Sequence, residues 1–162
     1  MSLEEQFKNA LSCWASGVSV VATRDQGQVY GLTVSSFSSL SLHPPLILCC
    51  LNNSNRMPSM IRGANGFTVS ILGAHQVDAS NAFARRGREP SEAFEGVSEG
   101  TSASGRPYLE ASAAWLDCEL EKSIVEGDHT IVIGRVVEIG ARPETDPLLY
   151  FQRAYRTVRD LP

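Results

Sequence analysis

The pattern of apolar and polar positions predicts one helix at the start of the chain, followed mainly by strands. Four apolar residues near the N-terminus recur at helical spacing: Phe7, Ala10, Leu11 and Trp14. Ser2 and Glu5 form a capping-box pattern before them, and Gly17 stops the run. The sequence therefore predicts an amphipathic helix between Ser2 and Gly17.

The next segments alternate or are β-branched, which favours strands. Residues 18–23 and 28–35 flank turn chemistry at residues 25–27 and so predict a hairpin. Pro44 and Pro45 then force a turn, because neither can donate to a sheet ladder. The unbroken apolar run 46–51 that follows indicates a buried strand.

The middle of the chain predicts two helices, a strand and a long loop. Three polar residues, Asn53, Ser54 and Asn55, can cap a short helix with Pro58 in its first turn and Gly63 past its end. Residues 66–72 predict a strand, and residues 75–86 predict a helix that carries Val77 and Phe83. Residues 87–107 lack periodicity and predict a loop.

The last third of the chain predicts a long hairpin and a covering tail. Residues 111–125 alternate, with Leu116, Cys118 and Leu120 on one face. The opposite face is predicted to be wet: Trp115, Asp117, Glu119 and Glu121. A turn at residues 127–129 leads to a second strand at 130–139, and residues 147–158 form a short helix or a covering segment. Because no βαβ alternation appears, the pattern predicts a mainly β fold with short helices, a closed or partly open antiparallel barrel.

Length, charge and composition exclude several classes of protein. The 162 residues suit one domain, residues 1–162, and a net charge of -4 without a long basic run predicts no nucleic-acid partner. With no signal-peptide pattern and no apolar stretch of membrane-spanning length, we expect a cytoplasmic protein without a membrane partner. The cysteines form no C-x-x-C pair, which favours buried thiols: Cys13, Cys49, Cys50 and Cys118. No dinucleotide, Walker or zinc motif appears, so we predict no metal site.

The stretch from Gly31 to Asn52 carries the strongest chemical signal. Serines gather around Phe37 on an extended backbone, so one side of the strand is lined with hydroxyl groups that can bind a polar ligand. The alternative is that these serines of a barrel strand simply face water. The following helix N-terminus, with Arg56 close by, suits a phosphate monoester, the alternative being an ordinary capped helix.

This stretch resembles the signature of the flavin reductase family. The matching segments are G-x-T-x-S-S-F from Gly31 to Phe37, P-P-L at residues 44–46 and C-L-N at residues 50–52. The resemblance continues from the W-A-S-G-V-S-V-V-A-T opening to G-D-H-T at residues 127–130 and P-L-L-Y-F-x-x-x-Y at the end, with His43 replacing the usual aspartate before the two prolines. It implies an antiparallel, Greek-key-like FMN-binding split β-barrel.

The resemblance also implies the site residues. His129 would face the reduced nicotinamide as the catalytic residue, and its imidazole could also supply a proton near neutral pH; a lone histidine at a turn is otherwise a surface side chain. Arg85 and Arg86 are available for a phosphate or are simply solvated, and Phe83 is either core or beside the flavin. The expected cofactor-binding residues are Thr33, Val34, Ser35, Ser36, Phe37, Cys50, Leu51, Asn52, Ser54, Arg56, Phe83 and Tyr155.

The implied function is NAD(P)H-dependent reduction of FMN or FAD, with hydride transfer from nicotinamide C4 to flavin N5. The family resemblance further implies a homodimer that supplies reduced flavin to a separate monooxygenase. NADH and NADPH stay equally open, because no ribose-reading residue can be placed. Two alternatives remain: a permanent FMN flavoprotein of the same barrel, and a ligand-binding split barrel without enzyme activity.

Overall fold

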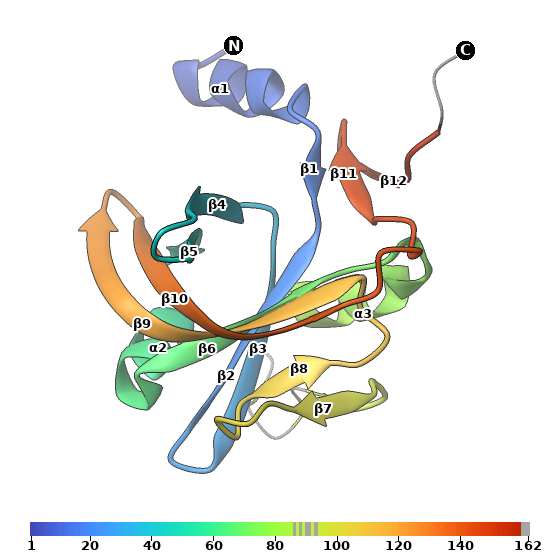
Figure 1. The fold of residues 1–162 in the computed structure, drawn as a ribbon. Helices are drawn as coiled ribbons and strands as arrows, with labels where there is room; N and C mark the ends of the chain where they lie inside the picture. The colour runs from blue at the N-terminus through green and yellow to red at the C-terminus, as the bar shows by residue number, and fades with distance from the viewer. Residues whose placement is uncertain (86, 88, 90–91, 93, 160–162) are drawn as a thin grey trace.

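The computed structural model describes residues 1–85, 87, 89, 92 and 94–159. It consists mainly of strands, with a few helices between them (Figure 1). The helical elements are α1 (Leu3–Ser12), α2 (Met57–Ala64), the 3₁₀ turn η1 (Ala74–Gln76) and α3 (Val77–Ala84). The strands are β1 (Ser16–Gly17), β2 (Ser19–Asp25), β3 (Gln28–Val34), β4 (Ser38–Ser41), β5 (Leu46–Asn52), β6 (Gly66–Ile71), β7 (Glu99–Thr101), β8 (Pro107–Leu109), β9 (Ala114–Glu126), β10 (His129–Ala141), β11 (Leu149–Phe151) and β12 (Ala154–Arg156).

Antiparallel pairing joins seven strands into one curved sheet with the order β3-β2-β6-β9-β10-β5-β4. Residues of β3, at one edge of this sheet, also contact β5, which lies next to the other edge, so the sheet curls toward closure as in a partly open barrel. The predicted antiparallel barrel architecture is thereby observed. The hairpins β2–β3 and β9–β10 were both predicted, because their turns carry glycine in the left-handed region, at Gly27 and Gly127.

Two hydrophobic cores hold the fold together. The larger lies inside the curved sheet and is closed by α2, whose Met57, Met60 and Ile61 pack against sheet residues such as Val69 and Leu51. The smaller joins the sheet to α3 and the C-terminal segment around Phe83, with Val18, Val20, Leu72, Leu109 and Leu148. Strand β5 is buried on only one face, where Ile47, Cys49 and Leu51 point inward, and is half-buried on the other. The unbroken apolar run therefore overstated its burial.

The tail is the covering segment of its two predicted forms, with Leu148 and Tyr155 packed in the smaller core, and the long loop differs from its prediction. Residues 149–156 form the hairpin β11–β12, not a helix, because β11 pairs with β1 and the turn residues Gln152 and Arg153 both adopt the left-handed conformation. The predicted loop 87–107 contains β7 and the start of β8, which pair with each other. Part of that loop, residues 88, 90–91 and 93, lies outside the described residues, as does residue 86 at the end of the preceding predicted helix.

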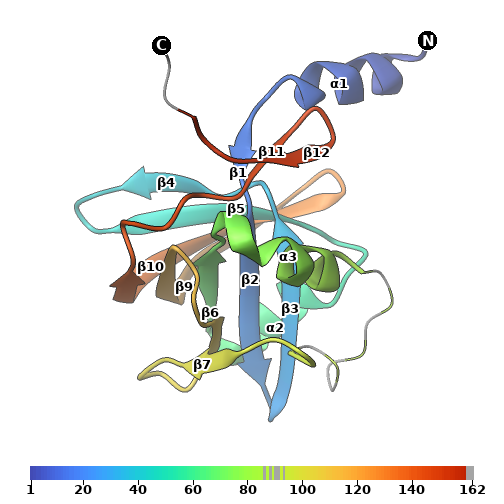
Figure 2. The same ribbon diagram turned by 90° about the vertical axis from the view of Figure 1, so that its right-hand side faces the viewer.

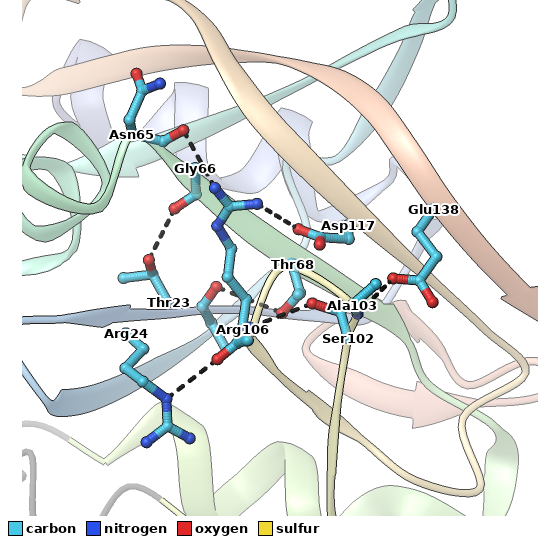
Figure 3. Close-up of polar contacts among 12 residues, drawn as sticks. Thr23, Arg24, Asn65, Gly66, Thr68, Ser102, Ala103, Arg106, Asp117 and Glu138 are labelled. Atoms are coloured by element: carbon cyan, nitrogen blue, oxygen red, sulfur yellow. Dashed lines mark hydrogen bonds and ion pairs between the residues drawn. The ribbon is translucent and has the colours of Figure 1, made fainter.

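Asp117 was predicted on a wet face and is fully buried instead. Arg106, which precedes β8, reaches from the β7–β8 hairpin toward β9 and places its Nη1 2.8 Å from Asp117 Oδ1, while its Nη2 donates to the carbonyl oxygen of Asn65 at 3.4 Å (Figure 3). The alternation of β9 could not reveal this partner, because Arg106 arrives from another strand pair. The prediction that the thiols are buried is correct for Cys49 and Cys118. Cys50 is only half-buried, and Cys13 is exposed.

Helix α1 stands apart from the seven-stranded sheet, close to the hairpin β11–β12 (Figures 1 and 2). Its predicted capping box is present, but none of its residues is buried. Its apolar side chains Leu3, Phe7 and Leu11 are each more than half exposed, at 82 %, 61 % and 54 %. Among the residues described, no helix is both long and apolar enough to cross a bilayer.

Candidate active site

A groove of about 630 Å³ opens where β3, β5 and β10 meet the start of α2 and the end of α3. Ligand pockets for small organic molecules measure roughly 300–1,000 Å³, so the groove has room for one. It collects nine of the residues singled out from the sequence: Thr33, Val34, Ser35, Ser36, Cys50, Asn52, Ser54, Arg56 and His129. Segments separated by almost a hundred positions are thus brought to one place by strand pairing.

Ser36 joins the two main walls of the groove. Its hydroxyl donates to the carbonyl oxygen of Cys50 at 2.7 Å and accepts from the Cys50 N–H at 3.1 Å. The Ser36 side chain therefore takes the place of a neighbouring strand, because it bonds both the N–H and the carbonyl oxygen of Cys50. Both hydrogen bonds are internal, so Ser36 shapes the groove more than it offers its hydroxyl to a ligand.

Thr33 has a similar internal role on the opposite side. Its hydroxyl donates to the carbonyl oxygen of Ser80 at 2.7 Å, which fixes α3 against β3. Ser80 in turn lies 2.8 Å from the hydroxyl of Tyr155, and Tyr155 donates to Asn81 at 3.0 Å. This chain of bonds ties β3, α3 and β12 together. By contrast, no described residue bonds the exposed hydroxyl of Ser35.

His129 begins β10 directly opposite Asn52, the last residue of β5. The register is held by the bond from the Asn53 N–H to the Asp128 carbonyl oxygen at 2.9 Å and by the buried Thr130 hydroxyl, which donates to Asn53 Oδ1 at 2.5 Å. The Nδ1 atom of His129 lies 2.6 Å from Asp128 Oδ1, which leaves Nε2 for a ligand. This hydrogen bond and the charge of the imidazolium lower the pKa of the Asp128 carboxyl.

The start of α2 offers fewer donors than the sequence suggested. Arg56 is the N-cap, the N–H of Met57 is already bonded to Asn55 Oδ1 at 3.0 Å, and Pro58 has no N–H. The positive charges of Arg56 and Arg85 both line the groove, with Arg56 Nη1 3.7 Å from Glu89 Oε2. A phosphate here would rely on guanidinium groups more than on the helix N-terminus. Arg86 lies outside the described residues.

Four predicted cofactor-binding residues do not line the groove. Leu51 is fully buried in the larger core, and Phe37 packs against that core. Phe83 is only 1 % exposed and lies in the smaller core, where its ring fills the space beside Gly31. Tyr155 packs against the smaller core and is bonded to Ser80 and Asn81 as described above. Any contact that Leu51 or Phe83 makes with a groove ligand would have to come from its backbone.

The sequence did not single out several groove residues: Tyr30, Leu32, Gly87 and Glu89. Tyr30 and Leu32 share a face with Val34 by the two-residue period of β3, and this period is the signal that could have found them. Gly87 and Glu89 follow α3 in a stretch without periodicity, so nothing local could have placed them.

Residues 11–159 match the model of the flavin reductase like domain. The chain belongs to this family. It is 39 % identical over 154 residues to the reductase component of 4-hydroxyphenylacetate 3-monooxygenase from Thermus thermophilus, covering 95 % of this chain and 96 % of the relative.

Two further relatives agree with this family assignment. The NADH-dependent flavin reductase StyB from Pseudomonas fluorescens is 37 % identical over 155 residues, covering 92 % of this chain and 86 % of StyB. The solved structure of the flavin reductase PheA2 in its native state superposes with a TM-score of 0.89 at 31 % identity, covering 99 % of this chain and all of PheA2. The split-barrel fold and the enzyme class predicted from the motifs, a flavin reductase that uses a reduced nicotinamide, are confirmed.

Proposed function

We propose that the groove binds FMN and reduced nicotinamide with their rings face to face, with NADH as the reductant. The observation that carries the proposal is the juxtaposition of the Ser35 hydroxyl, the Asn52 amide and His129 in one groove that Arg56 and Arg85 also line. Neutral hydroxyl and amide groups suit the uncharged edge of a flavin ring, and guanidinium groups suit its phosphate. NADH is supported by StyB, whose name gives NADH as its reductant.

The residues of the chain bind and orient, while the chemistry belongs to the ligands. A flavin accepts a hydride from reduced nicotinamide when the two rings are held face to face. Val34, Ser35, Cys50 and Asn52 form the wall against which the flavin would lie, and Ser54 and Arg56 are placed toward its phosphate. His129, fixed through Nδ1 by Asp128, directs Nε2 toward the nicotinamide.

We further propose that the protein is a homodimer and hands reduced flavin to a separate monooxygenase. The exposed apolar face of α1 supports dimerisation, because Leu3, Phe7 and Leu11 would otherwise remain in water. The Thermus thermophilus relative, named as the reductase component of a monooxygenase, supports the second partner.

NADH oxidation by the purified protein in air tests the proposal. Oxidation followed at 340 nm should depend on added FMN and saturate with it, as for a diffusing flavin substrate. No oxidation with NADH or NADPH, in the presence of FMN or FAD and folded protein, would overturn it. Protein that stays yellow through dialysis and needs no added flavin would instead identify a permanent flavoprotein.

A further inference from the structure

A second, smaller cavity of about 200 Å³ adjoins the groove and is not accounted for by the reaction described above. It shares Thr33, Val34, Ser35 and Ala84 with the groove, so the two cavities adjoin at these residues. Its remaining walls come from α3 and the hairpin β11–β12, chiefly Tyr150 and Tyr155. We call this cavity the tyrosine annex.

The chemistry of the annex differs from that of the groove. The groove carries Arg56, Arg85 and Glu89, whereas no charged residue lines the annex among the described residues. A phosphate is therefore unsuited to it. At about 200 Å³ the annex lies below the roughly 300 Å³ at which pockets for whole small molecules begin, so it accommodates one ring system of a larger ligand.

The aromatic wall of the annex is built in advance. Tyr155 is held by Ser80 and Asn81, and the ring of Tyr150 meets it edge-on, with centroids 5.6 Å apart and an interplanar angle of 66°. Tyr150 is paired with Ser16 in the β1–β11 ladder, and the following turn is tied to α1 by the bond from the Gln152 N–H to the Ser12 carbonyl oxygen at 3.0 Å. Tyr150 is nevertheless 39 % exposed, so part of its ring is available to a ligand.

The polar groups left open in the annex suit a planar heterocycle. Among the described residues, neither the Ser35 hydroxyl nor the Tyr150 hydroxyl has a hydrogen-bond partner, whereas those of Thr33 and Tyr155 are occupied. A neutral planar ring with donors and acceptors at its edge can stack on tyrosine and bond such hydroxyls. The nicotinamide belongs beside His129, which lines the groove but not the annex.

We infer that the tyrosine annex binds the adenine ring of a dinucleotide, with Tyr150 as its stacking residue. This inference rests on the proposed function, because the reaction supplies two ligands that can carry adenine: NADH and, when it is the flavin, FAD. FMN has no adenine. The annex would thus determine either the preference between FAD and FMN or the affinity for NADH.

The experiment compares Tyr150→Leu, which removes the ring, with Tyr150→Phe as the matched control that keeps it. Flavin fluorescence titrations without NADH measure the Kd for FAD and for FMN, and steady-state kinetics with FMN measure the KM for NADH. Size-exclusion chromatography and circular dichroism verify that both variants keep the fold and the oligomeric state. The binding titrations are independent of activity, so they distinguish this inference from a failure of the proposed reaction.

For Tyr150→Leu we expect an increase of about five- to tenfold in the Kd for FAD or in the KM for NADH, whichever ligand places its adenine in the annex. Tyr150→Phe should give values close to those of the unsubstituted protein. An increase confined to the Kd for FAD assigns the annex to the flavin's adenine, and an increase in the KM for NADH assigns it to the coenzyme. An equal increase in the Kd for FMN would overturn the inference, because the annex would then hold the flavin ring. Constants that all stay within twofold would also overturn it.

Discussion

The buried carboxylate of Asp117 and the guanidinium of Arg106 form an ion pair that fastens the β7–β8 hairpin to the main sheet (Figure 3). Asp117 has no exposed surface, and the side chain of Arg106 is only 13 % exposed. The second carboxylate oxygen, Oδ2, has no hydrogen-bond partner among the described residues. The stability of the protein therefore depends on keeping both residues, because removing one would leave the charge of the other buried without compensation.

Replacing Arg106 with methionine should lower the free energy of unfolding by about 3–5 kcal/mol, since it leaves the Asp117 carboxylate buried and unpaired. Urea denaturation followed by circular dichroism measures this change. The double variant Arg106→Met/Asp117→Leu removes both charges and should recover most of the loss. A single variant as stable as the original protein would show that Asp117 is already compensated elsewhere.

The Ser36→Ala variant should destabilise the protein by about 1–3 kcal/mol, because it strips both hydrogen bonds from the backbone of Cys50. The groove wall should loosen with it, so we expect the Kd for FMN to rise as well. Thermal unfolding and fluorescence titration measure the two effects. Ser38→Ala, on the exposed strand β4, is the matched control and should change neither.

Gly31 of the signature motif is required by its neighbour Phe83. A Cβ atom at position 31 would lie 2.3 Å from the Cε1 atom of Phe83, far inside contact distance. Gly31→Ala should therefore cost about 1–3 kcal/mol of stability, and Phe83→Leu in the same chain should return part of it. If the second substitution only adds to the loss, the close approach to Phe83 is not the reason for the glycine.

His129→Ala should raise the KM for NADH by about two- to tenfold, the value of one hydrogen bond, with a smaller effect on kcat. Steady-state kinetics at saturating FMN measure it. His75→Ala is the control, because His75 is exposed and does not line the groove. Unchanged kinetics in His129→Ala would remove this residue from the nicotinamide site.

The same substitution should change the titration of Asp128. Its carboxyl has a pKa below the ordinary value of 3.8 because of the hydrogen bond and charge of His129. A lowered pKa favours the ionised carboxylate in the folded state, so the stabilisation from this carboxylate is present above pH 3.8 and is lost as the pH falls through the lowered value. Carboxyl NMR titrations should show an upward shift of the pKa of Asp128 in His129→Ala. No shift would mean that another group stabilises the carboxylate.

Thiol labelling should separate the four cysteines. Burial raises the pKa of Cys118 to about 12 and that of Cys49 still further, so neither forms the reactive thiolate near pH 8. Iodoacetamide should label the exposed Cys13 first and the half-buried Cys50 of the groove more slowly, with FMN protecting Cys50. Peptide mass spectrometry would record this order. Early labelling of Cys49 or Cys118 would indicate that the core opens.

Local physics in the sequence determined most of the strands, the capped first helix and the family signature. β-branched alternation and turn glycines act between neighbouring residues, so residues 18–23, 28–35, 66–72 and 130–139 could be predicted as strands without knowledge of the fold. The same motif residues predicted most of the groove, because Ser35, Asn52 and His129 belong to short segments with recognisable order.

Only the tertiary structure decided which of these residues face a ligand and which are enclosed. Asp117 alternates like a solvent-facing residue but is buried, because Arg106 reaches it from a separate hairpin. Phe83 and Leu51 lie in motifs of the site yet fill the cores, since α3 and β5 turn them inward. Tyr150 joins Ser35 at the annex only through pairing with β1. Such outcomes depend on long-range pairing and packing, which leave no periodic trace in the sequence.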